Sequence, residues 1–378
     1  MPHAPRKVKL LMDTLVLCLV LLCLPALVLS AASPPAAAED SPAKKVVIAH
    51  RGASGYLPEH TLPAKALAHA MGADFLEQDV VLTKDAVPIV LHDIHLDTVT
   101  DVAKVYPERA RDDGRFYAID FTLAEIRRLN VSERFDRETA KAVYANRFPV
   151  GQGSFSVPTL AEEIELVQGL NKSTGRDVGI YPEIKSPAWH RQQGHDISKI
   201  VLKVLSKYGY QDRDDNVVVQ CFDAAECKRL RTELGTKLRL VQLIGENDWN
   251  EAATDYDHLR TAEGLKEIAS YADGIGPWMP HLVAEVQGSA DAGGGDPQTR
   301  EAKSGRWRDT GLVKLAHDAG LVVHPYTFRI DSPPPYSDDF DEVLRIFFFE
   351  VGVDGIFTDF PDRAVKFLGT ARDSKISR

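Results

Sequence analysis

The sequence is short of cysteine and of positive charge. Four cysteines among 378 residues are too few for a disulfide scaffold, and we expect Cys221 and Cys227 to be buried thiols. The formal charge is −10, from 45 Lys and Arg against 55 Asp and Glu, and no basic stripe offsets it. A nucleic acid or an anionic membrane surface is therefore an unfavourable partner. The remaining composition is that of a globular enzyme or binding protein.

Familiar motifs are missing too. The sequence has no P-loop, no dinucleotide-binding GxGxxG and no nucleophile-elbow GxSxG, and the glycines around Ser54 have the wrong spacing. No repeat of about 20–50 residues indicates a solenoid. A serine hydrolase and a solenoid are both disfavoured by these absences.

One long apolar run lies near the N-terminus. Residues 15–29 follow a basic segment and precede a stretch of small residues. This order predicts a secretory signal peptide over residues 1–38, with cleavage after Ala32 or Ala38. An uncleaved membrane anchor is the alternative, but the run is shorter than the roughly 20 residues of a span, and Pro25 interrupts it. We therefore expect no stable membrane insertion once the peptide is removed.

Strand-like and helix-like segments alternate over residues 39–378, which we treat as one domain. Apart from a hairpin return at 88–92, the strand-like runs are 46–50, 75–82, 179–184, 217–222, 238–244, 272–275, 321–326 and 355–358. Helical patterns lie between most of them, at 61–71, 197–207, 224–234, 312–319 and 340–350. Eight such units predict an α/β fold of the TIM (β/α)8 barrel type, in preference to an open doubly wound sheet.

Two segments interrupt the alternation. Residues 93–158 are rich in Asp, Arg and aromatic side chains and are predicted to be an insertion after the second strand. Residues 281–306 contain three consecutive glycines and are predicted to be a loop. Long segments of this kind are functional covers or disordered stretches more often than core.

Carboxylates gather at the predicted strand ends, which form the functional face of a barrel. Glu77 and Asp79 are two residues apart, so both point to one face of their strand, and Glu183 ends the next barrel strand. Three carboxylates form an oxygen-only cage that suits Ca²⁺ or Mg²⁺ better than zinc. The alternative explanations are a solvated strand face for Glu77 and Asp79 and a simple ion pair of Glu183 with Lys185, and the shared location at strand ends argues against both.

Cations and histidines lie at the ends of neighbouring strands, with His50 and Arg51 after the first, His92 after the hairpin return and Lys185 after the third. Arg51 and Lys185 could bind an anion next to the metal, most simply a phosphate. His50 and His92 have the chemistry of a general acid and base. Four further histidines are predicted to lie at the surface or in loops, namely His190, His195, His281 and His317.

Several motifs together resemble one known family. They are HRGASGYLPEHTL at 50–62, EQDVVLTKD at 77–85, LHD at 91–93, PEIK at 182–185 and DGIFTDFPD at 354–362. In order and spacing they resemble the signature of the glycerophosphodiester phosphodiesterases over residues 46–368. The segments EHT at 59–61, GIYP at 179–182, QCFD at 220–223 and VHPYT at 323–327 are similar to the bacterial periplasmic type.

The resemblance implies an activity and a set of residue roles. It implies hydrolysis of glycerophosphodiesters, such as glycerophosphocholine and glycerophosphoethanolamine, to an alcohol and sn-glycerol 3-phosphate. It also implies a periplasmic location, an insertion that covers the site, and Ca²⁺ as the metal, with Mg²⁺ as the alternative. By position, the metal ligands are Glu77, Asp79 and Glu183, the acid/base pair is His50 and His92, and the phosphate ligands are Arg51 and Lys185. Glu59 matches a position near the glycerol and the metal.

Two other classes of protein stay open. One is a related enzyme that cleaves lipids, against which the polar insertion and a net charge of −12 after loss of the signal peptide argue. The other is a protein that captures glycerophosphodiesters for uptake, which has no need for paired histidines. The sequence decides neither the head group nor the oligomeric state, a homodimer included.

Overall fold

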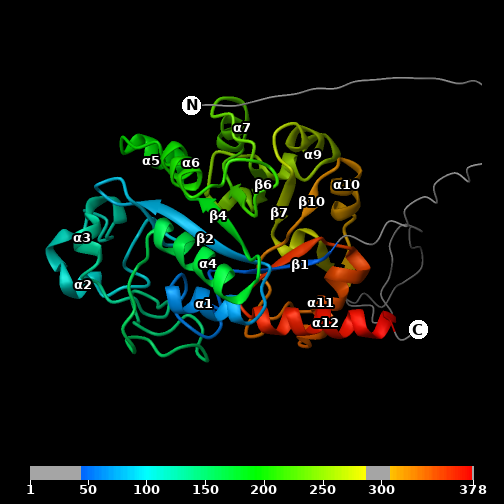
Figure 1. Cartoon of the computed structure of the whole chain (residues 1–378), viewed down its shortest axis with the longest axis horizontal. Helices are drawn as coiled ribbons and strands as arrows, with labels where there is room; N and C mark the ends of the chain where they lie inside the picture. Colours follow the sequence, from blue (N-terminus) through cyan, green and yellow to red (C-terminus); the bar gives the residue numbers. More distant parts are fainter. Residues whose placement is uncertain (1–43, 287–306, 377–378) are drawn as a thin grey trace, which may run out of the picture. The chain divides into compact units, whose positions relative to one another are not determined.

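A computed structural model describes residues 44–286 and 307–376. In this part of the chain, eight parallel strands form a nearly closed barrel with helices around it (Figure 1), in the order β10-β7-β6-β5-β4-β2-β1-β11. They are β1 (Val46–Ala49), β2 (Phe75–Leu82), β4 (Gly179–Ile184), β5 (Val218–Cys221), β6 (Arg239–Ile244), β7 (Gly274–Pro277), β10 (Val322–Val323) and β11 (Gly355–Thr358). The predicted TIM barrel is confirmed. The predicted signal peptide lies outside the described residues.

The barrel closes between its last two strands. Backbone hydrogen bonds join Asp354 N to Val323 O and Phe357 N to Pro325 O, both at 3.0 Å. β10 has only two residues, although the sequence predicts a strand over 321–326. Backbone hydrogen bonds to β7 continue beyond it, from His324 N to Ile275 O at 2.9 Å and from Tyr326 N to Pro277 O at 3.1 Å, so the predicted segment lies along β7 although its regular strand is shorter. The last strand is nevertheless placed beside the first, where its carboxyl end reaches the site.

Helices with one buried face surround the strands. The longer ones are α1 (Leu62–Ala70), α4 (Leu160–Thr174), α6 (Ile197–Lys207), α7 (Ala224–Thr232), α9 (Ala262–Ala269), α10 (Leu312–Asp318) and α12 (Pro361–Ile376). The shorter α5 (Pro187–Gln192), α8 (Tyr256–Leu259) and α11 (Phe340–Arg345) follow β4, β6 and β10. A capping box of Thr159 and Glu162 begins α4. The predicted helix at 340–350 is α11 continued by a π-helical turn, Ile346–Val351.

The predicted insertion, residues 93–158, follows the hairpin strand β3 (Pro88–Val90) and precedes α4. It contains α2 (Val102–Val105) and α3 (Leu123–Ile126), which lie on the side of the barrel where β2 ends (Figure 1). Its buried apolar side chains form a cluster separate from the barrel core, including Leu96, Val99, Val102, Phe116, Phe121, Ile126, Leu129 and Val131. The insertion is therefore a folded cover with a small core of its own rather than a bare loop.

Other predicted features have mixed outcomes. Cys221 and Cys227 are buried free thiols, as expected. His190 is buried in α5, contrary to the predicted surface or loop position, and His281 is in the turn Met279–His281 after β7 but is buried as well. The predicted loop at 281–306 begins with β8 (Val283–Glu285), which pairs with β9 (Trp307–Asp309), and residues 287–306 lie outside the described part. Among the described residues, none of the helices is both long and apolar enough to span a membrane.

Candidate active site

The three carboxylates predicted to hold a metal lie buried on neighbouring strands. The register of β2 and β4 places Asp79 beside Glu183, and Glu77 lies two residues earlier on β2. Burial and the nearby charge of Asp79 raise the pKa of Glu77 well above its ordinary value. Burial likewise raises the pKa of Glu183 to about 8, although Lys185 opposes the shift. Ionising all three carboxylates at once is thus unfavourable, and a bound cation would offset the repulsion between them.

Asp79 is the exception, because its pKa is well below the ordinary value. Burial alone would raise it, but His92, Lys185 and His60 outweigh that effect. His60 Nε2 lies 2.8 Å from Asp79 Oδ2, while the other carboxylate oxygen, Oδ1, is buried without a hydrogen-bond partner. An unpartnered buried carboxylate oxygen among further oxygen donors fits a divalent cation.

His60 belongs to the same cluster, although the sequence analysis assigned it no role. In the described part of the chain, His60, Glu77 and Asp79 form a group whose ligand atoms all lie within 4.8 Å of one another. Glu183 is not part of this group, so the set differs from the predicted one by a single residue. The EHT segment was a signal for His60, but its contact with Asp79 depends on how the loop after β1 folds back.

Each predicted catalytic histidine is paired with an aspartate through Nδ1. His50 Nδ1 lies 2.6 Å from Asp359 Oδ1, and His92 Nδ1 lies 2.6 Å from Asp93 Oδ1. Burial and then Arg51 lower the pKa of His50 to about 4, and the same two causes lower that of His92. A carboxylate on Nδ1 favours the tautomer whose Nε2 carries a lone pair. Both histidines are therefore suited to accept a proton.

Arg51 and Lys185 lie on either side of the carboxylates. Arg51 has a positive φ of 60°, and its Nε lies 3.6 Å from Asp79. Lys185 Nζ lies 2.8 Å from Glu183 and 4.0 Å from Asp79. Glu59 accepts hydrogen bonds from Arg51 at 2.9 Å and from Arg134 at 2.6 Å. Burial would raise the pKa of Glu59, but these two arginines hold it well below the ordinary value.

A cavity of about 190 Å³ opens beside these groups. It is lined by His50, Arg51, Ser54, Glu59, His92, Arg134, Val143, Tyr144, Arg147, Arg329 and Asp359. Four of the predicted site residues therefore meet at one cavity, while the carboxylate cluster and Lys185 are not among its lining residues. The insertion contributes Arg134, Val143, Tyr144 and Arg147 to the wall of this cavity.

Four charged residues that line this cavity were not among the predicted site residues, namely Arg134, Arg147, Arg329 and Asp359. Arg147 Nη2 and Arg329 Nε donate to Asp359 Oδ2 at 2.6 and 2.7 Å, which holds the partner of His50 in place. Asp359 lies in the DGIFTDFPD segment, which was a usable signal. Arg147 lies in the insertion, where no periodic pattern marks it.

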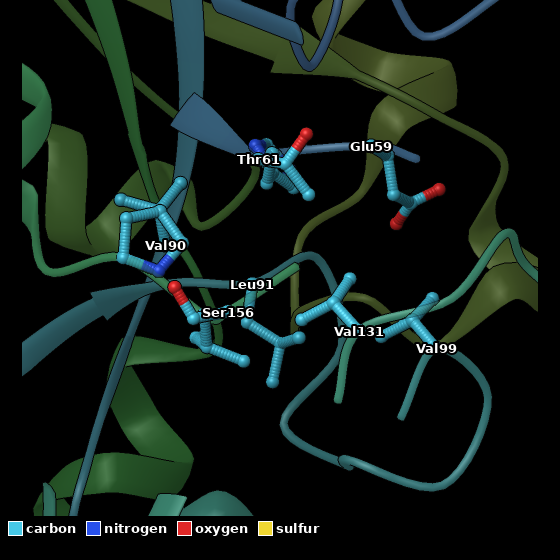
Figure 2. A pocket seen from close by; sticks show the side chains of 10 residues that line it. Glu59, Thr61, Val90, Leu91, Val99, Val131 and Ser156 are labelled. Atoms are coloured by element: carbon cyan, nitrogen blue, oxygen red, sulfur yellow. The ribbon is translucent and has the colours of Figure 1, made fainter. Parts of the chain in front are cut away.

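A second cavity, about 10 Å³ and thus water-sized, lies behind Glu59. Figure 2 shows Glu59 and Thr61 on one side of it and Leu91, Val99 and Val131 on the other. The last two belong to the apolar cluster of the insertion. Apolar side chains therefore pack against the loop that carries Glu59. The Glu59 carboxylate itself accepts hydrogen bonds from Arg51 and Arg134.

Comparison with known proteins agrees with this geometry. Residues 50–363 match the model of the glycerophosphoryl diester phosphodiesterase family. A glycerophosphodiester phosphodiesterase from Haemophilus influenzae is 46% identical over 340 residues, which cover 86% of this chain and 90% of that protein. One from Treponema pallidum is 39% identical and covers 86% of this chain and 92% of its own.

Solved structures share the fold. A structure from Silicibacter pomeroyi is 28% identical with a TM-score of 0.61, and the match covers 87% of this chain and 95% of that one. A phosphodiesterase from Oleispira antarctica, solved with the product sn-glycerol-3-phosphate, has a TM-score of 0.55 at 20% identity and covers 86% of this chain and 96% of that one. The chain therefore belongs to the glycerophosphoryl diester phosphodiesterase family.

Proposed function

We propose that the protein hydrolyses glycerophosphodiesters, such as glycerophosphocholine and glycerophosphoethanolamine, to an alcohol and sn-glycerol 3-phosphate. The observation that carries this proposal is the pair of histidine–aspartate contacts at one cavity, next to a buried carboxylate cluster. Family membership supports the same reaction class. A protein that only captures the ligand would gain nothing from two oriented proton carriers.

The residues divide the chemistry between charge and proton transfer. Arg51 and Lys185 would place positive charge beside the phosphodiester oxygens, where negative charge grows during the reaction. One of His50 and His92 would take a proton from the nucleophile, and the other would protonate the departing alkoxide. The anionic substrate would raise the pKa of a nearby histidine and so favour the protonated acid. The nucleophile is either water or the neighbouring glycerol hydroxyl, the latter through a cyclic phosphate.

The carboxylate cluster completes the proposed site. Glu77, Asp79 and Glu183 would hold Ca²⁺, with Mg²⁺ as the alternative, and Glu59 would orient Arg51. Such an ion supplies Lewis-acid stabilisation of the phosphoryl oxygens when it is bound. We further propose that the N-terminal segment directs the protein to the periplasm, where deacylated phospholipids would be its substrates.

The test is the release of glycerol 3-phosphate from glycerophosphocholine by the purified protein. We expect a chelator to abolish the release and Ca²⁺ or Mg²⁺, added separately, to restore it. No release with either ion, from a protein shown to be folded by circular dichroism, would overturn the proposed function. Tight binding of the diester without product would favour ligand capture instead.

Variants of the two histidines test their roles. His50→Ala and His92→Ala should each lower kcat about 10²- to 10⁴-fold with little change in KM, because each removes a proton carrier rather than a binding contact. His317→Ala is the control, since His317 is exposed and pairs with Asp354 away from the cavity. A histidine variant that keeps the kcat of the control would remove that residue from the proposed chemistry.

A further inference from the structure

A fully buried lysine lies beneath the carboxylate cluster and takes no part in the chemistry proposed above. Lys65 on α1 has no exposed surface, and its Nζ lies 2.9 Å from Glu163 Oε2 on α4, which is equally buried. The same ammonium donates a hydrogen bond to the backbone carbonyl of Glu77 and lies 3.4 Å from His60 Nδ1. Burying an ammonium ion costs several kcal/mol, which suggests that Lys65 has a role at the neighbouring site.

That role concerns the tautomer of His60, that is, which of its two ring nitrogens carries the proton. An ammonium group has three N–H donors and no acceptor, so it can only face a lone pair on Nδ1. The ring proton must then sit on Nε2, which lies 2.8 Å from Asp79 Oδ2 and donates to it. The other tautomer would point an N–H at the ammonium of Lys65 and a lone pair at a carboxylate oxygen. Both contacts would be repulsive.

This tautomer decides whether His60 can bind a metal. A neutral histidine coordinates a metal through a nitrogen that carries a lone pair. A ring nitrogen of His60 is within ligand reach of Glu77 and Asp79, and Nε2 is the nitrogen that lies beside Asp79, so coordination through it would make a mixed nitrogen and oxygen site. Such a site suits zinc, whereas oxygen ligands alone suit Ca²⁺ and Mg²⁺.

We propose that Lys65 fixes the Nε2–H tautomer of His60, keeps this histidine out of the metal coordination, and thereby reserves the site for oxygen-preferring cations. His60 is then a positioning residue that holds Asp79 by Oδ2 and leaves Oδ1 available to the ion. Glu163 balances the charge of Lys65 from the opposite helix. The selectivity part of this proposal rests on the metal site of the proposed function, while the tautomer part does not.

The tautomer is tested without any metal. The full chain, labelled with ¹⁵N-histidine and treated with chelator, should give a His60 signal with Nδ1 unprotonated and Nε2 protonated. His60→Gln identifies the signal by its loss. A His60 signal with the proton on Nδ1 would overturn the proposal, whatever the protein does with metals.

The selectivity is tested with paired variants and direct binding of the ions. In Lys65→Met/Glu163→Gln, which removes both members of the buried ion pair, we expect Zn²⁺ affinity to rise at least 10-fold relative to Ca²⁺ by calorimetry. The control is Lys228→Met/Glu267→Gln, a surface ion pair between two helices. An unchanged affinity ratio in the folded double variant would overturn the proposal. A wild-type protein that binds neither ion would instead count against the proposed metal site.

His60→Gln keeps the test independent of how well the double variant folds. A glutamine amide can donate to Asp79 from the same place as Nε2 but supplies no nitrogen lone pair. Ca²⁺ affinity should therefore stay within about threefold of the wild type. A loss of 10-fold or more would make His60 a metal ligand and overturn the proposal.

Discussion

At the scale of single residues, Asp359 holds three side chains at the end of the last barrel strand. Its carboxylate accepts hydrogen bonds from His50, Arg147 and Arg329. In Asp359→Asn the amide can donate to His50 and favour the wrong tautomer, so we expect kcat to fall about 10²- to 10⁴-fold with little change in KM. Steady-state hydrolysis of glycerophosphocholine measures this. Asp362→Asn is the matched control, and equal kcat values for the two variants would show that His50 needs no orienting carboxylate.

His190 is a residue whose burial affects stability rather than catalysis. Its Nε2 accepts from Leu82 N at 3.2 Å, its Nδ1 donates to Ser186 O at 3.1 Å, and burial lowers its pKa to about 4. As the pH falls from about 6.5 to 4, His190 becomes protonated in the unfolded chain but stays neutral in the folded protein. The free energy of unfolding therefore decreases, by a total of roughly 3 kcal/mol. Above pH 6.5 both states are neutral and the contribution is complete.

The pH dependence is measured by urea unfolding at several pH values between 7 and 4.5. Other buried histidines titrate in the same range, so the wild type is compared with His190→Asn, which removes one titrating group. We expect a smaller loss of stability on acidification in this variant than in the wild type or in His195→Asn. Equal losses in all three proteins would mean that His190 is protonated in the folded state.

At the scale of elements, the insertion is joined to the barrel by ion pairs. Arg134 donates to Glu59 in the loop after β1 at 2.6 Å, and to Asp93 at the start of the insertion itself at 2.7 Å, and all three side chains are largely buried. Arg134→Met takes away one positive partner from each of two largely buried carboxylates and leaves Glu59 to Arg51 and Asp93 to His92, so we expect the free energy of unfolding to fall by about 3 kcal/mol. Chemical denaturation measures the change. Arg137→Met, at a more exposed arginine, should cost less than about 1 kcal/mol, and a similar cost for both would deny Arg134 a bridging role.

Elements with a clear period were the ones that the sequence could predict. α6 was predicted over its whole length because Ile197, Val201 and Leu205 repeat on one face, and all three are buried. The strand predicted over 321–326 is regular only at Val322–Val323, although His324 and Tyr326 still donate backbone hydrogen bonds to β7. The insertion helices have four residues each, too few to show a helical period, so the positions of Arg134 and Arg147 could not be predicted.

At the scale of the whole molecule, the barrel explains why part of the site was predictable. Strand ends meet at one face in any TIM barrel, so His50 and His92 were expected together from their positions alone. Asp359 lies 309 residues after His50, and their contact depends on the closure of the last strand against the first. Contacts of that kind follow from three-dimensional register rather than from local pattern, and Lys65 beneath His60 belongs with them.

The buried carboxylates also link the site to the stability of the whole fold. If the proposed ion binds only the folded protein, Ca²⁺ at about 100 times its Kd should add about 2.7 kcal/mol to the free energy of unfolding and raise Tm by several degrees. Burial raises the pKa of Glu183 to about 8, so below that pH a proton competes with the ion. The gain in Tm should therefore be larger at pH 8.5 than at pH 6.5.

Scanning calorimetry with Ca²⁺ or with chelator measures the gain in Tm, and Asp79→Asn should lose most of it. An equal Tm with and without Ca²⁺ at both pH values would show that the cluster holds no such ion.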